Sequence, residues 1–205
     1  MILYDYFRSS SAYRVRIALN LKQLDYERRE VHLLKDGGEQ HSLDYLALNP
    51  QGRVPTLVDG ELTIFQSSVI LDYLEEQYPG KPLLPQAKED KLYVKMLCNI
   101  VACDMQPLNN LAVLQYLQGD LGCSDEQKQA WYEHWIHVGF KPFEKLLQMH
   151  AGQYCLGDQV TLADVYLVPQ VFNAKRFAVN LAAYPLIEKI YANCNRLKPF
   201  LNAAP

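Results

Sequence analysis

Three consecutive serines near the N-terminus are the residues best placed to do chemistry. Ser9, Ser10 and Ser11 lie between a short apolar run, residues 2–4, and a helix-favouring stretch that includes Val15. A serine at a helix start accepts a hydrogen bond from a free backbone N–H group, and that end of the helix carries partial positive charge. The segment is therefore a site for an anion such as a thiolate, although serines that only cap a helix would give the same pattern.

A proline turn and a second polar helix start follow further along the chain. Pro55 directly precedes a predicted strand, where its missing N–H group is tolerated. A cis bond after Val54 would leave the Val54 N–H and C=O groups free to pair with a peptide ligand, although trans is the more frequent form. Gln66 and Ser67 open another predicted helix, whose N-terminus could bind a carboxylate or could simply be capped.

The elements that must position these residues alternate over the first 80 positions. Strands are predicted at about residues 2–4, 26–31, 56–58 and 62–64, and helices at about 11–23, 42–48 and 66–78. Asp59-Gly60 between the last two strands is a strong hairpin signal, because the turn needs positive φ. This order indicates a mixed sheet rather than a doubly wound nucleotide-binding sheet, and no GxGxxG motif is present.

A proline-rich linker at residues 79–85 separates this part from an all-helical part. Helices are predicted beyond it at about 88–118, 125–149, 162–176 and 185–193. Thr161 and Asp164 fit a capping box at the start of the third helix, so Asp164 is assigned to folding rather than to catalysis. We therefore predict two domains, residues 1–80 and residues 87–205.

Composition and charge argue against several classes of protein. The chain has 205 residues, 49% of them hydrophobic and 21% charged, which argues against disorder. A net charge of −3 with scattered basic residues argues against a nucleic-acid surface. No secretion signal or bilayer-spanning run is recognised, so we expect a cytosolic protein without membrane contacts. Five cysteines without a CxxC pair indicate reduced thiols, and His134 and His137 lack further ligands, so no metal site is predicted.

Taken together in their order along the chain, the serine, proline-turn and helix-start segments resemble those of the cytosolic glutathione transferases, and the resemblance covers nearly the whole chain. Val54-Pro55 and Gln66-Ser67 are similar to the glutathione-binding elements of that superfamily. Further segments resemble its zeta class, the maleylacetoacetate isomerases: Ser9-Ser10 followed by residues 13–19, residues 106–111, and residues 167–171 with Arg176-Phe177. The resemblance implies an α/β thioredoxin-like N-terminal domain followed by an all-α C-terminal domain.

The resemblance also implies a glutathione site across the first domain. It implies a cis Pro55, with the cysteinyl backbone of glutathione paired to Val54. The γ-glutamyl carboxylate would lie at Gln66 and Ser67. Gln40 matches a position that contacts the glycyl end.

The resemblance further implies how the serines act. Ser9, assisted by Ser10, would donate a hydrogen bond to the glutathione thiolate, because an alcohol is too weak a base to take the proton. Ser11 is included among the glutathione-binding residues. Gln106 and Asn110 match positions that reach the site from the helical domain, in part from the partner subunit of a homodimer.

The implied reaction is glutathione-dependent cis–trans isomerisation of maleylacetoacetate to fumarylacetoacetate, a step of tyrosine and phenylalanine catabolism. The substrate is an acid, so a cation is needed. Arg176 matches the family position for it, and Arg8 is a second candidate, although a surface ion pair would explain either arginine. The alternatives are a maleylpyruvate isomerase, a general glutathione transferase acting on α-haloacids, and a binding module without activity. Substrate preference, glutathione affinity and the motion of residues 35–42 stay open.

One position departs from the family pattern. Zeta-class proteins usually carry Ser-Ser-Cys at the junction, and this chain has Ser11 in place of the cysteine. The isomerase reaction uses the thiol of glutathione, so we expect it to survive. Activities that depend on the protein cysteine, and alkylation at that position, are put in question.

Overall fold

The computed structural model describes residues 1–205 and divides into two compact units. Unit 1 comprises Met1–Pro82 together with Leu197–Pro205, and unit 2 comprises Leu83–Arg196. The C-terminal segment therefore packs with the first unit, whereas the sequence places it in the helical domain. None of the helices combines the length and the apolar character that a membrane span requires.

Unit 1 contains a four-stranded mixed sheet of order β2-β1-β3-β4. Its strands are β1 (Ile2–Asp5), β2 (Glu27–Glu30), β3 (Thr56–Asp59) and β4 (Leu62–Phe65). β1 runs parallel to β2 and antiparallel to β3, and β3 and β4 form an antiparallel hairpin. The mixed sheet and the hairpin predicted at Asp59-Gly60 are both confirmed.

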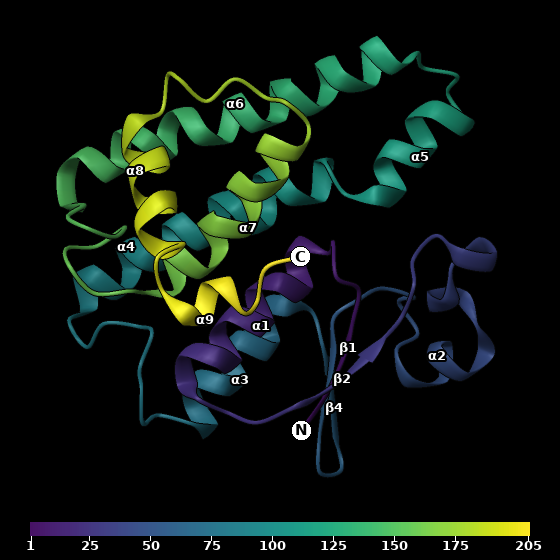
Figure 1. Cartoon of the computed structure of the whole chain (residues 1–205), viewed down its shortest axis with the longest axis horizontal. Helices are drawn as coiled ribbons and strands as arrows, with labels where there is room; N and C mark the ends of the chain where they lie inside the picture. Colours follow the sequence, from purple (N-terminus) through teal and green to yellow (C-terminus); the bar gives the residue numbers. More distant parts are fainter. The chain divides into compact units, whose positions relative to one another are not determined.

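The helices of unit 1 cover this sheet and its edges. They are α1 (Ser10–Lys22), α2 (Leu43–Leu48), α3 (Ser67–Gln77) and α9 (Lys198–Leu201), with short 3-10 turns η1 (Lys35–Gly37) and η2 (Glu39–His41). α1 packs beside α3, and α9, at the yellow end of the chain, lies beside α1 (Figure 1). Leu3, Ile17, Leu57 and Leu74 from four of these elements are completely buried and form the apolar core.

Unit 2 is helical apart from its loops and two isolated bridges, as the sequence predicts. Its longer helices are α4 (Lys88–Asn99), α5 (Leu111–Gly119), α6 (Asp125–His150), α7 (Leu162–Arg176) and α8 (Pro185–Cys194). The helices predicted at residues 125–149, 162–176 and 185–193 are confirmed.

The helical stretch predicted over residues 88–118 is present but is interrupted. After α4 the chain passes through a π-helical segment, η3 (Ile100–Met105), and a 3-10 turn, η4 (Gln106–Leu108). Pro107 has no N–H group to continue a helical ladder. Asn110 then starts α5 afresh, because its Oδ1 accepts the Val113 N–H at 3.1 Å.

Helix α7 begins on the predicted capping box, deep in unit 2. The Asp164 carboxylate is fully buried and accepts the N–H groups of Thr161 at 2.8 Å and Cys155 at 2.9 Å. Burial raises the pKa of the Asp164 carboxyl, and these hydrogen bonds oppose the rise. Asp164 thus ties a loop to the start of α7, which is a folding role.

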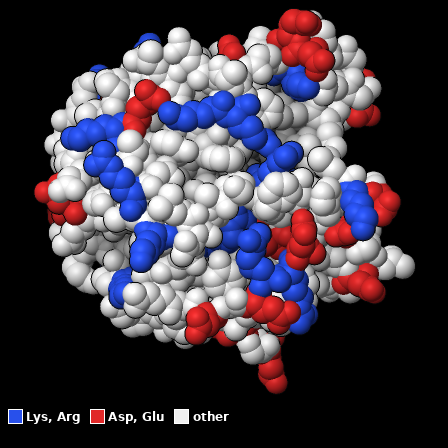
Figure 2. Space-filling model, in the orientation of Figure 1, with Lys and Arg blue, Asp and Glu red and all other residues white.

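Charged side chains of both signs occur in small groups on the face shown in Figure 2. Two ion pairs of unit 1 are instead withdrawn from solvent. Asp5 pairs with Arg16 at 2.6 Å, and Lys22 pairs with Glu75 at 2.7 Å. Loss of one partner from such a pair leaves an uncompensated buried charge, so these pairs hold the local geometry tightly.

Candidate functional site

The first turn of α1 is arranged to hold an anion. Ser9 is its N-cap, with extended backbone at φ −71° and ψ 119°, and its Oγ accepts the Ala12 N–H at 3.2 Å. The hydroxyl oxygen serves the helix, so the hydroxyl hydrogen is left for an acceptor outside it. The first turn carries no acidic residue, and the N–H groups of Ser10 and Ser11 lie where the helical ladder offers no partner.

The residues beside this turn differ in exposure. Ser10 is buried and Ser11 is partly exposed. Arg8 is exposed and lies with its guanidinium 5.0 Å from the centre of the Phe7 ring. No carboxylate forms an ion pair with Arg8, so its charge is not committed to the protein itself.

The loop before β3 presents an unpaired stretch of backbone. The bond between Val54 and Pro55 is cis. The ladder of β3 begins only at Thr56, and the Val54 N–H and C=O groups make no hydrogen bond within the chain. One extended residue of a bound peptide could pair with both groups, as a further strand would.

A buried polar network holds both flanks of Val54. The Tyr45 hydroxyl donates to the Arg53 carbonyl at 2.6 Å, and the Asn49 side-chain amide donates to the same oxygen at 2.8 Å. The Asn49 amide also donates to Thr56 Oγ1 at 3.0 Å. Burial raises the pKa of the Tyr45 hydroxyl, which keeps it protonated as a donor. Sequence reasoning missed Tyr45 and Asn49, whose buried polar groups only the fold brings to the loop.

The start of α3 is open rather than capped. Gln66 occupies the cap position at φ +70°, a strained conformation for a residue with a side chain, and makes no side-chain capping bond. Its amide donates instead to Gln51 Oε1 at 2.8 Å. The alternative that this helix start is simply capped is therefore not what the structure shows. The first N–H groups of α3 stay available to an anion.

Ser67 connects the two helix starts. It is buried, and its Oγ accepts a hydrogen bond from Arg14 Nη1 at 3.3 Å, so its own hydrogen is left to be donated elsewhere. Arg14, in the second turn of α1, is almost completely buried and places a positive charge beside the start of α3. Sequence reasoning did not assign Arg14 to the site; the available signal was the pair Arg14 and Arg16 on either side of Val15 in a helix.

Gln40 has an unsatisfied buried oxygen. Its Nε2 donates to the Leu33 carbonyl at 3.4 Å, while its Oε1 is buried without any partner. Gly38, at φ +102°, leaves the room for this amide, because a side chain there would collide with it. A buried acceptor without a donor is unfavourable, and a ligand N–H group would satisfy it.

Three predicted site residues belong to unit 2. Gln106 is the first residue of η4 and is partly exposed. Asn110 uses both ends of its amide within the chain, donating to the Pro107 carbonyl at 2.7 Å and capping α5. Arg176, at the end of α7, is exposed, forms no ion pair, and lies 4.9 Å from the centre of the Phe177 ring. The other predicted site residues all belong to unit 1.

The chain matches two family models along its length. Residues 3–82 match the glutathione S-transferase N-terminal domain, and residues 110–202 match the glutathione S-transferase C-terminal domain. A probable maleylacetoacetate isomerase of Vibrio cholerae is 50% identical over 100% of this chain and 95% of its own length.

Two solved structures share the fold closely. One is the holo structure of a maleylpyruvate isomerase, described as a bacterial zeta-class glutathione S-transferase. It is 45% identical, with a TM-score of 0.97, and the match covers 100% of this chain and 97% of that one. The other is a maleylacetoacetate isomerase of Methylobacterium extorquens AM1 with bound malonate and glutathione, 37% identical, with a TM-score of 0.94 over 100% of both chains. The chain therefore belongs to the glutathione S-transferase family, in its zeta class.

Proposed function

We propose that this enzyme uses glutathione to isomerise maleylacetoacetate to fumarylacetoacetate. The observation that carries the proposal is the start of α1. Ser9 uses its oxygen to cap the helix, keeps its hydrogen for donation, and stands at a helix end free of acidic residues. Such a site favours a thiolate over a thiol. The names of the relatives supply the substrate class.

Three features of unit 1 fit glutathione, which carries a peptide backbone and two carboxylates. The Val54 N–H and C=O groups are unpaired, the Gln40 Oε1 lacks a donor, and α3 starts without a side-chain cap. Val54 would hold the cysteinyl backbone, Gln66 and Ser67 the γ-glutamyl carboxylate, and Gln40 the glycyl end. When bound, glutathione supplies a thiolate that adds reversibly to the double bond of the substrate and so permits rotation.

The contribution required of Ser9 is of a realistic size. A thiol with a pKa near 8.5 is only a few per cent ionised at pH 7, and lowering that value by two units takes roughly 2.7 kcal/mol. A hydrogen bond to a charged group contributes about 1.5–3 kcal/mol and a helix N-terminus about 0.3–1 kcal/mol. Ser9 and the start of α1 together reach that range, with Ser10 assisting.

Arg176 is proposed to bind a carboxylate of the substrate, with Arg8 as a second candidate. Both are exposed and free of ion pairs. Arg176→Ala should raise KM for the substrate roughly tenfold, because a charge-assisted hydrogen bond is lost. Lys175→Ala is the matched control, since Lys175 at the same helix end pairs with Glu188 at 2.9 Å. An unchanged KM in the Arg176 variant would show that Arg176 does not bind the substrate carboxylate.

The decisive test is a direct assay of maleylacetoacetate and of maleylpyruvate, each with and without glutathione. We expect isomerisation only when glutathione is present, with the higher kcat/KM for maleylacetoacetate. A preference for maleylpyruvate would favour the second candidate, which the 0.97 TM-score to a maleylpyruvate isomerase supports. No turnover of either acid would overturn the proposed reaction.

We further propose a cytosolic homodimer in which Gln106 and Asn110 serve glutathione sites, in part across the subunits. Leu92 and Met96, one turn apart on α4, are each more than half exposed, and a second copy of the chain could cover them. Sedimentation equilibrium should give twice the chain mass. A monomer at micromolar concentration would contradict the proposed assembly.

A further inference from the structure

Arg16 connects three separate segments of unit 1. Its side chain is almost completely buried. Nη1 donates to both carboxylate oxygens of Asp5, at 2.6 and 2.8 Å, and Nη2 donates to the Phe7 carbonyl at 3.0 Å. Nε donates to the Ala203 carbonyl at 2.8 Å. One guanidinium thus binds the end of β1, the turn that follows it and the C-terminal segment.

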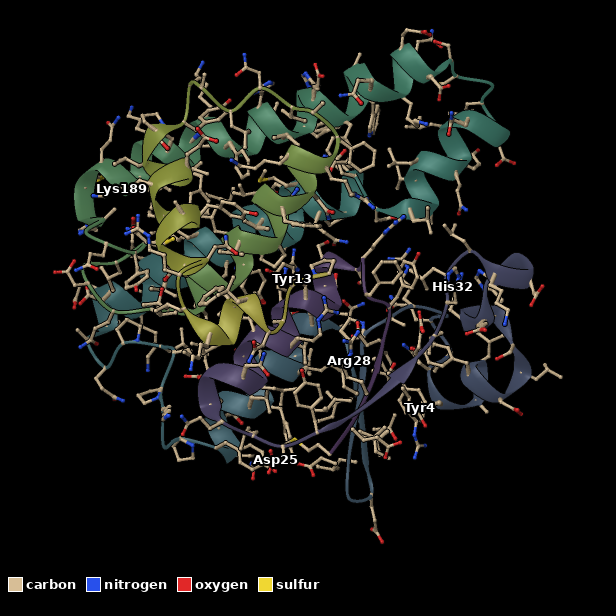
Figure 3. The ribbon with its side chains drawn as sticks, viewed as in Figure 1. Tyr4, Tyr13, Asp25, Arg28, His32 and Lys189 are labelled. Carbon is tan, nitrogen blue, oxygen red and sulfur yellow. The ribbon has the colours of Figure 1, made fainter.

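The turn that Arg16 binds is the one that delivers Ser9. The Ser9 N–H donates to the Tyr6 carbonyl at 2.8 Å, so Phe7 lies inside a tight turn that ends at the capping serine. Asp5, just before this turn, is held from its other side by Arg28 of β2 at 2.7 Å; Arg28 is labelled in Figure 3. The position of the Ser9 hydroxyl therefore depends on how firmly the turn is held.

The C-terminal segment reaches α1 at two independent points. The Asn20 amide donates to the Pro199 carbonyl at 2.9 Å, and Arg16 donates to Ala203 as described. Ala203 is completely buried, and its N–H donates to the Phe200 carbonyl at 3.2 Å. Of these two contacts, only the one at Ala203 is linked, through the Arg16 guanidinium, to the turn that ends at Ser9.

We propose that the C-terminal segment Leu197–Pro205 is a positioning element of the thiol site. The Ala203 carbonyl orients Arg16, and Arg16 orients the Phe7 carbonyl and hence Ser9. Without Ala203, a buried N–H of Arg16 loses its acceptor, and the guanidinium turns to find another. The inference rests on the proposed donation from Ser9 to the glutathione thiolate, and Arg16 acts through Ser9 without touching the substrate.

A pair of truncations tests the proposal. A chain that ends at Asn202 loses the Ala203 carbonyl, whereas a chain that ends at Ala204 keeps it. The readout is the pKa of the thiol of bound glutathione, followed by thiolate absorbance against pH, together with kcat/KM and Tm. We expect the chain ending at Asn202 to raise that thiol pKa by roughly half a unit and to lower kcat/KM about threefold at pH 7. The chain ending at Ala204 should match the wild type.

Asn20→Ala separates positioning from general loosening. It removes the other contact of the same segment, so it should lower Tm without moving the thiol pKa. Equal thiol pKa values for the Asn202-terminated chain and the wild type would overturn the proposal, as would an equal rise in Asn20→Ala. If the truncated chain does not fold, Arg16→Lys serves instead, because a lysine lacks the fork that reaches all three acceptors, and the same rise is expected. A wild type that does not lower the glutathione thiol pKa would instead refute the proposed function of Ser9, and the inference with it.

Discussion

The N-termini of helices α1 and α7 are built alike but have different roles. Each follows an extended residue that bears a hydroxyl group, Ser9 in one and Thr161 in the other. At α7 the anion belongs to the chain, because the buried Asp164 carboxylate accepts two N–H groups. At α1 the first turn has no acidic residue, and we propose that a ligand supplies the anion there. A helix start that is filled by the chain's own carboxylate serves folding, and one that stays open is available to a ligand.

The largest expected effect is a loss of folding stability when the Asp164 carboxylate is removed from the start of α7. Asp164→Ala leaves the Thr161 and Cys155 N–H groups buried without an acceptor, so it should lower the free energy of unfolding by roughly 2–4 kcal/mol. Urea denaturation measures the loss. Ser124→Ala, at the exposed capping box of α6, is the control and should lose only about 1 kcal/mol. Equal losses of unfolding free energy in the two variants would mean that burial of the Asp164 carboxylate adds nothing to stability.

The open start should respond mainly in catalysis, beyond the roughly 1 kcal/mol of stability lost with the Ser9 cap. Ser9→Ala removes the donor to the thiolate, so kcat/KM at pH 7 should fall roughly 10- to 100-fold. Because the thiol pKa rises, the ascending limb of the pH–rate profile should move to higher pH, and activity should recover above it. Ser42→Ala removes a comparable cap from α2, where Ser42 accepts the Tyr45 N–H at 3.3 Å, and should leave the profile in place. A profile that does not move in Ser9→Ala contradicts the assignment.

The start of α3 should affect affinity without affecting chemistry. A carboxylate is already ionised at pH 7, so losing the Ser67 hydroxyl changes binding alone. Ser67→Ala should raise KM for glutathione about fivefold while kcat stays constant. Ser68→Ala, at the exposed neighbouring position, is the control. A fall in kcat as large as the rise in KM would contradict the assignment of chemistry to the start of α1 and of binding alone to the start of α3.

The smallest effect is expected from restoring the family's usual cysteine. Ser11→Cys should leave isomerase kcat/KM within about twofold, because glutathione already provides the nucleophile. A thiol in the first turn of a helix is acidic, so the variant should gain rapid alkylation by iodoacetamide. Peptide mass spectrometry distinguishes it from Cys103, which is exposed in the wild type and provides the background. A tenfold change in kcat/KM would assign position 11 a catalytic part.

Local rules predicted most of the fold. The serine cap of α1, the Asp59-Gly60 hairpin and the box at Thr161 are set by neighbouring residues, and all three are present. The break after α4 has a local cause in Pro107, which lacks the N–H group of a helical ladder, but it also involves packing. Gly139 of α6 leaves room for the Met105 side chain at the end of η3, where any larger residue would collide. Residues this far apart in the chain leave no local pattern.

The sequence predicted which residues form the candidate site better than it predicted their hydrogen bonds. The sequence identifies Ser9, Val54 and Gln66 as polar or backbone sites, but not which of their atoms stay unpaired. The positive φ of Gln66 was not foreseeable, because that conformation ordinarily selects glycine. The link from Ala203 to the serine turn depends on a side chain crossing between segments at opposite ends of the chain.

The unpaired groups at Val54 and Gln40 have a consequence for the lifetime of the protein. At the proposed site these groups meet glutathione only in the folded chain, so its binding would stabilise the folded state. A ligand at about 100 times its Kd adds roughly 2.7 kcal/mol to folding stability. A cell depleted of this thiol would then lose enzyme molecules to unfolding and proteolysis as well as losing their cofactor. The abundance of the enzyme would follow the supply of its own cosubstrate.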